Sequence, residues 1–356
     1  MPHFRLRDDE DTLWLSVADS HENGFSMLVS DRLRRLLTQI PHPGDQKPRL
    51  FVFLGSKTRH VAVRTMWPSA LSSRQRRKLT GCHLALDAAS TFSDRPLLLA
   101  EADMSHNIQD EVEINHSTER VIVHYDIGSP KLKPGSSDYG LVYARVLCPF
   151  AEVVCVFVQD YPNLEHLVNE IAGWIRQGRT VTFSDDSVRP QLLLVTKMNL
   201  PLNLEDFATR LVEVSGTPFQ SSFSQISMVP IRDETVLSAL ARYRPVKEAV
   251  MRSADEVRAA RDRCLYLFSA RHFVSFLDMA AHDLSLSPLE SFDTVQASRR
   301  SCPVSAALQF NISDFLTTIL MSKINCAEAI PIIATALLAD HYGPRMHCKT
   351  SPTCLC

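Results

Sequence analysis

Residues 55–62 come closest to a pattern that could bind a nucleotide. A phosphate-binding loop has the pattern G-x-x-x-x-G-K-[ST]: its backbone N–H groups surround the phosphates, its lysine reaches the β and γ oxygens, and its hydroxyl binds Mg²⁺. Gly55 fits the first position, but His60, Val61 and Ala62 stand where G-K-[ST] is required. Residues 55–58, with the sequence GSKT, imitate the end of such a loop but lack its first glycine and its length. The segment therefore predicts the frame of a phosphate site without its chemistry.

No pattern in the chain provides a complete set of catalytic residues. A serine hydrolase needs the nucleophile pattern G-x-S-x-G on a strained turn after a strand. Residues 135–140, GSSDYG, are one residue too long and lie in a proline-flanked loop. Asp278, His282 and Asp283 could do acid–base work, but we interpret them as a surface helix end, because no nucleophile motif lies nearby. We expect no catalytic residues.

The last residues hold groups that could bind a metal or carry lipid. His341, His347 and Cys348 precede Cys354 and Cys356, but no C-x-x-C pair is present, and we expect no metal site. The C-x-C ending resembles the site at which Rab-type GTPases receive two geranylgeranyl groups. Such lipidation depends on an escort protein that reads an intact GTPase surface, so lipid anchoring at Cys354 and Cys356 stays an alternative that we do not favour.

Short apolar runs predict the strands that would position these residues. Continuous apolar runs are typical of strands buried on both faces of a parallel sheet. Such runs occupy residues 50–54, 97–100, 153–158 and 191–196, and residues 13–20 and 226–231 could form a first and a last strand. Helices are predicted over residues 29–39 and 164–178 and after Asn203. This alternation predicts an α/β fold with a mainly parallel sheet.

After residue 232 the pattern becomes helical. Pro245 is expected to start a charged helix, and further helices are predicted over residues 312–320 and 327–340. An apolar stripe between them should pack on the α/β domain; it contains Phe268, Phe273, Phe276 and Leu277. The expected organisation is an N-terminal segment (1–45), a GTPase-like α/β domain (46–232), an α-helical region (233–342) and a flexible tail (343–356).

Composition excludes several broad classes. The 356 residues are 45% hydrophobic and 22% charged, as expected for a globular chain, and the net charge of −2 gives no reason to expect nucleic-acid binding. No apolar stretch is long enough for an ordinary transmembrane helix, and the first residues have no apolar signal-peptide core. The nine cysteines fit reduced thiols better than a disulfide framework. We therefore expect a cytoplasmic protein.

The order of elements resembles the region that precedes the hydrolase domain in large fungal patatin-like phospholipase proteins, a region that is itself similar to a P-loop GTPase. The strings that carry this resemblance are residues 94–100, 150–174, 267–273 and 340–342. It implies a degenerate P-loop fold without the patatin domain, and no lipase activity should be carried over.

The resemblance also indicates where two further nucleotide motifs would lie. A D-x-x-G motif, whose aspartate orders Mg²⁺, would follow residues 94–100, where this chain has the sequence EADM over 101–104. The guanine-reading motif [NT]-K-x-D is best preserved, with Thr196, Lys197 and Asn199, but an amide replaces its carboxylate and loses one hydrogen bond to guanine. An ordinary exit from a strand explains the same residues equally well. Any site at Gly55, Thr196, Lys197 and Asn199 is therefore expected to be vestigial, with no cofactor.

We interpret the chain as a non-catalytic accessory protein that acts through a protein partner or through self-association. The alternatives are a divergent NTP-binding switch and an inactive remnant of a patatin-like lipid hydrolase.

Overall fold

The computed structural model describes most of the chain. The described residues are 12–20, 24–70, 81–102, 122–128, 138–178, 186–199, 202–232, 237–264, 266–288, 292–294, 297, 306–322 and 325–341. The chain divides into two compact units, Met1–Phe292 and Asp293–Cys356. This division differs from the expected boundary near residue 232, because the helices that follow the last strand still cover the sheet.

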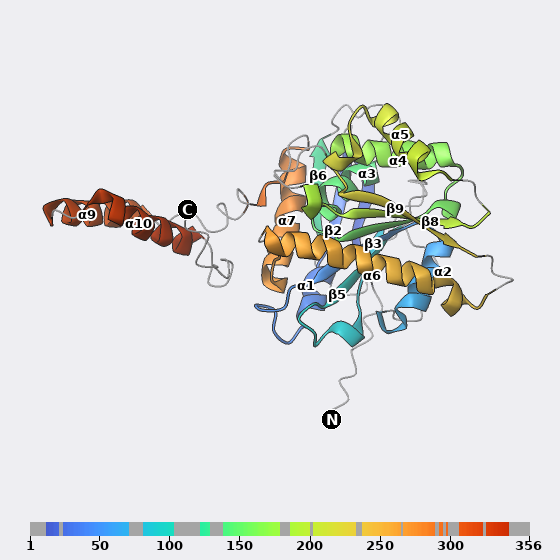
Figure 1. The fold of residues 1–356 in the computed structure, drawn as a ribbon, viewed down its shortest axis with the longest axis horizontal. Helices are drawn as coiled ribbons and strands as arrows, with labels where there is room; N and C mark the ends of the chain where they lie inside the picture. Colours follow the sequence, from blue (N-terminus) through green and yellow to red (C-terminus); the bar gives the residue numbers. More distant parts are fainter. Residues whose placement is uncertain are drawn as a thin grey trace, which may run out of the picture. The chain divides into compact units, whose positions relative to one another are not determined.

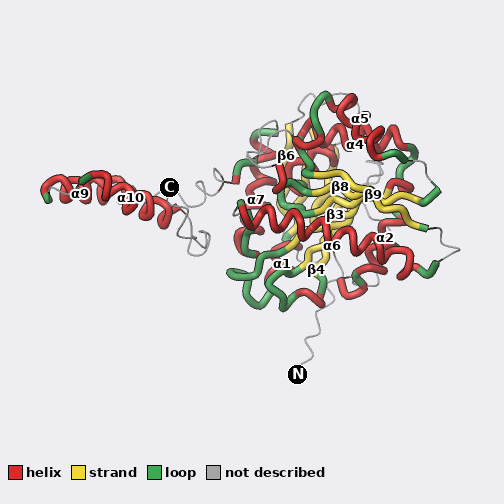
Figure 2. The backbone as a smooth tube through the Cα atoms, viewed as in Figure 1, coloured by secondary structure: helices red, strands yellow, loops and turns green. Residues whose placement is uncertain are grey.

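The first unit is built on one nine-stranded sheet with the order β6-β2-β1-β4-β5-β3-β7-β8-β9 (Figures 1 and 2). Its strands are β1 (Leu13–Ser20), β2 (Gly24–Ser30), β3 (Arg49–Leu54), β4 (Cys82–Leu86), β5 (Leu97–Ala102), β6 (Ile122–Gly128), β7 (Val153–Phe157), β8 (Gln191–Lys197) and β9 (Gln225–Ile231). The six strands predicted from the sequence are confirmed, while β2, β4 and β6 were missed.

The sheet is mixed rather than mainly parallel. The strands from β5 to β9 form four parallel pairs, β5–β3, β3–β7, β7–β8 and β8–β9. The four other pairs, β6–β2, β2–β1, β1–β4 and β4–β5, are antiparallel. The expectation of a mainly parallel sheet is therefore wrong for half of the pairs, because it depended on the continuous apolar runs, which identify β3, β5, β7 and β8.

Helices cover the sheet. In the first unit they are α1 (Arg32–Leu37), α2 (Lys57–Met66), α3 (Asp138–Val142), α4 (Leu164–Gln177), α5 (Leu204–Ser215), α6 (Ala239–Arg263) and α7 (Ala270–Leu286). Side chains of α2 and α6, such as Val63 and Val250, share one buried cluster with Phe51 and Phe53 of β3. Figure 1 shows α4 and α5 together, away from α2 and α6. The central strands are thus buried on both faces.

Two of the predicted helix starts are confirmed in detail. Asn163 caps the start of α4, and its side-chain oxygen accepts a hydrogen bond from the backbone N–H of His166 at 2.7 Å. Asn203 caps the start of α5 in the same way, accepting from the N–H of Glu205 at 3.0 Å. Short polar side chains at these positions pair an N–H group that the helix itself leaves free.

The predicted start of the next helix is wrong. The helix α6 begins six residues before Pro245, which lies inside it. Its start is capped by Ser238, whose hydroxyl oxygen accepts from the N–H of Ala241. A serine cap outweighs the preference of proline for the first turn, and packing of the long helix against the sheet offsets the N–H that proline lacks.

The predicted apolar stripe packs on its own unit, although Phe268 lies before α7 and is only half-buried. Phe273, Phe276 and Leu277 are buried, and the rings of Phe273 and Phe150 meet edge to face with their centroids 5.7 Å apart. The second unit contains α9 (Ala306–Met321) and α10 (Cys326–His341), which confirm the last two predicted helices. The tail, with Cys354 and Cys356, and residues 135–137 of the segment 135–140 lie outside the described residues.

Candidate functional site

The turn between β3 and α2 lies at the carboxyl ends of the parallel strands, where α/β proteins bind ligands. The strands β5, β3, β7 and β8 run parallel, so their carboxyl ends meet at one edge. Ligands of open α/β sheets lie outside these ends. Gly55 and Ser56 alone connect the end of β3 with the first residue of α2. This connection is much shorter than a phosphate-binding loop.

The Asp160 carboxylate fills the space at the start of α2. Asp160 ends the short helical turn η4 (Val158–Asp160) that follows β7, the strand beside β3. One of its oxygens, Oδ2, accepts hydrogen bonds from the backbone N–H groups of Ser56 at 2.8 Å and Arg59 at 3.0 Å. The other oxygen, Oδ1, accepts from the N–H of Thr58 at 3.1 Å. The first N–H groups of a helix have no partner within the helix and form a natural anion site, which here holds a carboxylate of the protein itself.

Gly55 permits this close approach. Its backbone φ is +143°, a conformation that glycine adopts without strain. A Cβ atom at this position would lie 2.7 Å from Asp160 Oδ2 and 3.2 Å from the Cβ of Phe157. The glycine that the sequence offered as a phosphate-loop residue therefore makes room for Asp160.

Charged side chains next to this turn pair with each other. Arg59 is 1% exposed, and its Nε lies 3.7 Å from Oε2 of Glu101, which is also buried. His60 Nδ1 lies 3.7 Å from the same oxygen. Glu101 belongs to the segment where a magnesium-ordering aspartate was sought, but it lies against a cation of the protein. Burial raises the pKa of the nearby Cys82 thiol to about 12, so this sulfur stays protonated.

The residues proposed to read guanine lie two strands away from the turn. Thr196, near the end of β8, is buried, while Lys197 and Asn199 are exposed at and just beyond the strand end. Between them, the N–H of Met198 donates to the carbonyl oxygen of Ile231 at 2.9 Å, which continues the pairing of β8 with β9. Gly55 and Thr196 thus both lie near the carboxyl ends of parallel strands, with β7 between these strands.

Asp160 was missed by reasoning from the sequence. A signal existed, because an aspartate that closely follows a buried parallel strand lies near the helix starts at the same sheet edge. The sequence does not indicate which of these helices the carboxylate reaches.

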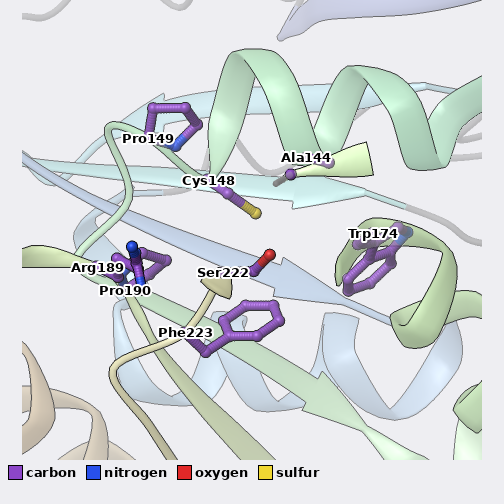
Figure 3. A pocket seen from close by; sticks show the side chains of 9 residues that line it. Ala144, Cys148, Pro149, Trp174, Arg189, Pro190, Ser222 and Phe223 are labelled. Carbon is purple, nitrogen blue, oxygen red and sulfur yellow. The ribbon is translucent and has the colours of Figure 1, made fainter. Parts of the chain in front are cut away.

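A pocket lies near Cys148 and Ser222 (Figure 3). The Cys148 sulfur and the Ser222 hydroxyl point into it in this view, and Trp174 and Phe223 contribute apolar walls. Burial raises the pKa of the Cys148 thiol to about 12, so it is a poor nucleophile. The apolar lining and protonated thiol do not indicate a catalytic site.

Two features are absent from the described residues. No group of three or more histidine, cysteine, aspartate or glutamate side chains is arranged there to hold a metal ion. Among the helices that can be described, none combines the length and apolar character needed to cross a membrane.

Comparisons with known proteins add no family. No model of a protein family matches this chain, and no curated protein matches it.

Proposed function

We propose that this chain is a non-catalytic protein with a GTPase-like frame, in which the Asp160 carboxylate takes the place of a nucleotide phosphate. The observation that carries the proposal is the set of three hydrogen bonds from the start of α2 to Asp160. A carboxylate held by these groups repels a phosphate and occupies its donors.

The arrangement of the strands supports the GTPase-like frame. The segment after β3 would bind phosphates, that after β5 would order Mg²⁺, and that after β8 would read guanine. The carboxyl ends of the three strands meet at one edge of the sheet, with β3 beside β5 and β7 between β3 and β8. At each segment a residue required by the nucleotide is replaced: His60, Val61 and Ala62 for G-K-[ST], Glu101 for aspartate, and Asn199 for the guanine-binding carboxylate.

Exposed apolar side chains support a role in protein contacts. In the second unit, Phe310, Met321 and Ile330 are 71%, 80% and 64% exposed. Large exposed apolar side chains that belong to one pair of helices are a feature of interaction sites. With the phosphate donors occupied, a function through protein contacts fits these features better than a nucleotide-driven switch.

Calorimetry with GTP and ATP, with and without Mg²⁺, tests this proposal. We expect dissociation constants no tighter than about 1 mM, because the lysine and the magnesium ligand are replaced and the N–H donors are occupied. Micromolar GTP binding by the unmodified chain would overturn the proposal and favour a divergent NTP-binding switch.

A matched pair of variants tests the role of Asp160 directly. In Asp160→Ala the three N–H groups become available, so inorganic phosphate should shift the amide NMR signals of Ser56, Thr58 and Arg59. The Asp186→Ala variant removes an equal charge elsewhere and should leave these signals unresponsive, as in the unmodified chain. Equal responses in all three proteins would contradict the assignment of Asp160 as the occupant of an anion site.

A further inference from the structure

The two edges of the nine-stranded sheet are protected to different degrees. Pro230 lies in the edge strand β9, where it lacks the N–H needed to pair with another strand. Proline and lysine on edge strands are common means of preventing sheets from joining. The opposite edge strand, β6, has the sequence IVHYDIG, with neither residue. Of the two edges, β6 is therefore the one suited to pair with a further strand.

Several side chains of β6 face solvent. Within the described part of the chain, β2 is the strand that pairs with β6, along all seven residues. Val123 is 44% exposed, and His124 and Asp126 are exposed as well. Tyr125 points to the opposite face from His124 and Asp126, where its ring lies 6.2 Å from that of His282 in α7. His124 and Asp126 are thus exposed on one face of β6. Among the described strands, β2 alone forms backbone pairs with β6.

We propose that β6 is a self-association site, where it pairs antiparallel with β6 of a second copy about a twofold axis at Tyr125. The two sheets then join into one continuous sheet. This inference does not depend on the proposed function, because it uses the opposite end of the strand order from β9 and none of the residues around Asp160.

The register follows from the geometry of antiparallel pairs. Residues directly opposite each other must both direct their N–H and C=O groups toward the partner or both direct them away. In a symmetric pair, one residue therefore lies directly opposite the same residue of the second copy, and the twofold axis passes midway between them. The three central choices are His124, Tyr125 and Asp126.

The pairing of an imidazole with a carboxylate selects Tyr125. An axis at Asp126 places two carboxylates directly opposite, which is unfavourable, and an axis at His124 places two imidazoles opposite. An axis at Tyr125 places His124 opposite Asp126 of the second copy, twice, and Val123 opposite Ile127 of the second copy. The Oδ1 of Asp126 accepts from the Ser26 hydroxyl at 2.6 Å, which orients the carboxylate on this face. A second copy therefore places an imidazole opposite a carboxylate on both sides of the axis.

Sedimentation equilibrium of the full chain at several concentrations measures this association. We expect a reversible dimer that His124→Glu weakens about tenfold, because two attractive cross-strand pairs become repulsive. The double variant His124→Glu with Asp126→Lys restores an opposite-charge pair at both positions and should recover the affinity. Asp206→Lys, an exposed charge change on α5, should leave the affinity unchanged, and circular dichroism verifies that each variant folds.

Three outcomes would overturn the proposal. They are a chain that stays monomeric at every concentration, a dimer that His124→Glu does not weaken, and a dimer that is lost on Phe310→Glu but retained in His124→Glu. The last result would place the interface on α9.

Discussion

At the scale of single residues, Asp160 and Gly55 together determine the character of the site. Gly55 supplies a backbone conformation and an open approach, and Asp160 supplies the anion. The carboxylate lies at the positive end of the helix dipole and accepts three backbone hydrogen bonds, so it stabilises the start of α2. The same geometry that excludes a phosphate therefore contributes to folding.

Removing this carboxylate should destabilise the protein. For Asp160→Ala we expect the free energy of unfolding to fall by about 1–3 kcal/mol, because three N–H groups lose a charged acceptor. Asp160→Asn keeps one acceptor oxygen and should lose less. Urea unfolding followed by circular dichroism measures the difference. An alanine variant as stable as the unmodified chain would show that water replaces the carboxylate at no cost.

At the scale of elements, buried ion pairs connect α6 with the amino ends of β3 and β7. Glu152, just before β7, accepts from Arg49 Nε at 2.7 Å and from Arg258 of α6 at 2.9 Å, and all three side chains are buried. Arg261 of α6 donates to the carbonyl oxygens of Val188 and Phe150 at 2.8 and 3.0 Å. Burial lowers the pKa values of Arg258 and Arg261, and the Glu152 carboxylate opposes this shift.

Neutralising the central carboxylate tests this connection. Glu152→Gln leaves Arg258 buried without its counter-charge and leaves Arg49 with the exposed Asp255 alone, so we expect a loss of about 3–5 kcal/mol in the free energy of unfolding. Asp255 also pairs with Arg49, at 2.8 Å, but its side chain is 58% exposed. Asp255→Asn should therefore cost less than about 1 kcal/mol. Chemical denaturation of both variants gives the comparison, and equal losses would contradict a special role for Glu152.

At the scale of the whole molecule, the first unit contains the complete sheet and the helices that cover it. Phe292, its last residue, packs against Phe150 and Phe276 with ring centroids 5.7 and 6.3 Å away. In the second unit, by contrast, α9 and α10 expose many of their large apolar side chains. The first unit therefore has its own hydrophobic core.

Deleting residues 293–356 should leave the first unit folded. We expect its thermal midpoint to change by less than about 3 °C, since the core of the sheet is retained. Deleting residues 265–356 also removes α7, whose Phe273 packs on Phe150, and should lower the midpoint strongly or abolish the cooperative transition. Melting curves of the two truncated chains separate these cases. Loss of the transition in the shorter deletion would contradict an independent first unit.

The amino-acid sequence by itself determined the strands that are buried on both faces and the residues that the nucleotide motifs lack. A continuous apolar run such as residues 50–54 has one stable environment, the interior of a covered sheet, so its structure follows from local composition. The helix caps Asn163 and Asn203 could be predicted for the same reason, because each acts within three residues of itself.

Only the tertiary structure decided which distant residues meet. The strands β2, β4 and β6 have weak local patterns and are stabilised by pairing with neighbours across the sheet. Asp160 reaches Ser56 across 104 positions of the chain, and Arg258 reaches Glu152 across 106. Such contacts depend on the order of strands in the sheet, which the spacing of residues along the chain does not encode. The occupied anion site and the place of β6 at the end of the strand order therefore follow from the fold.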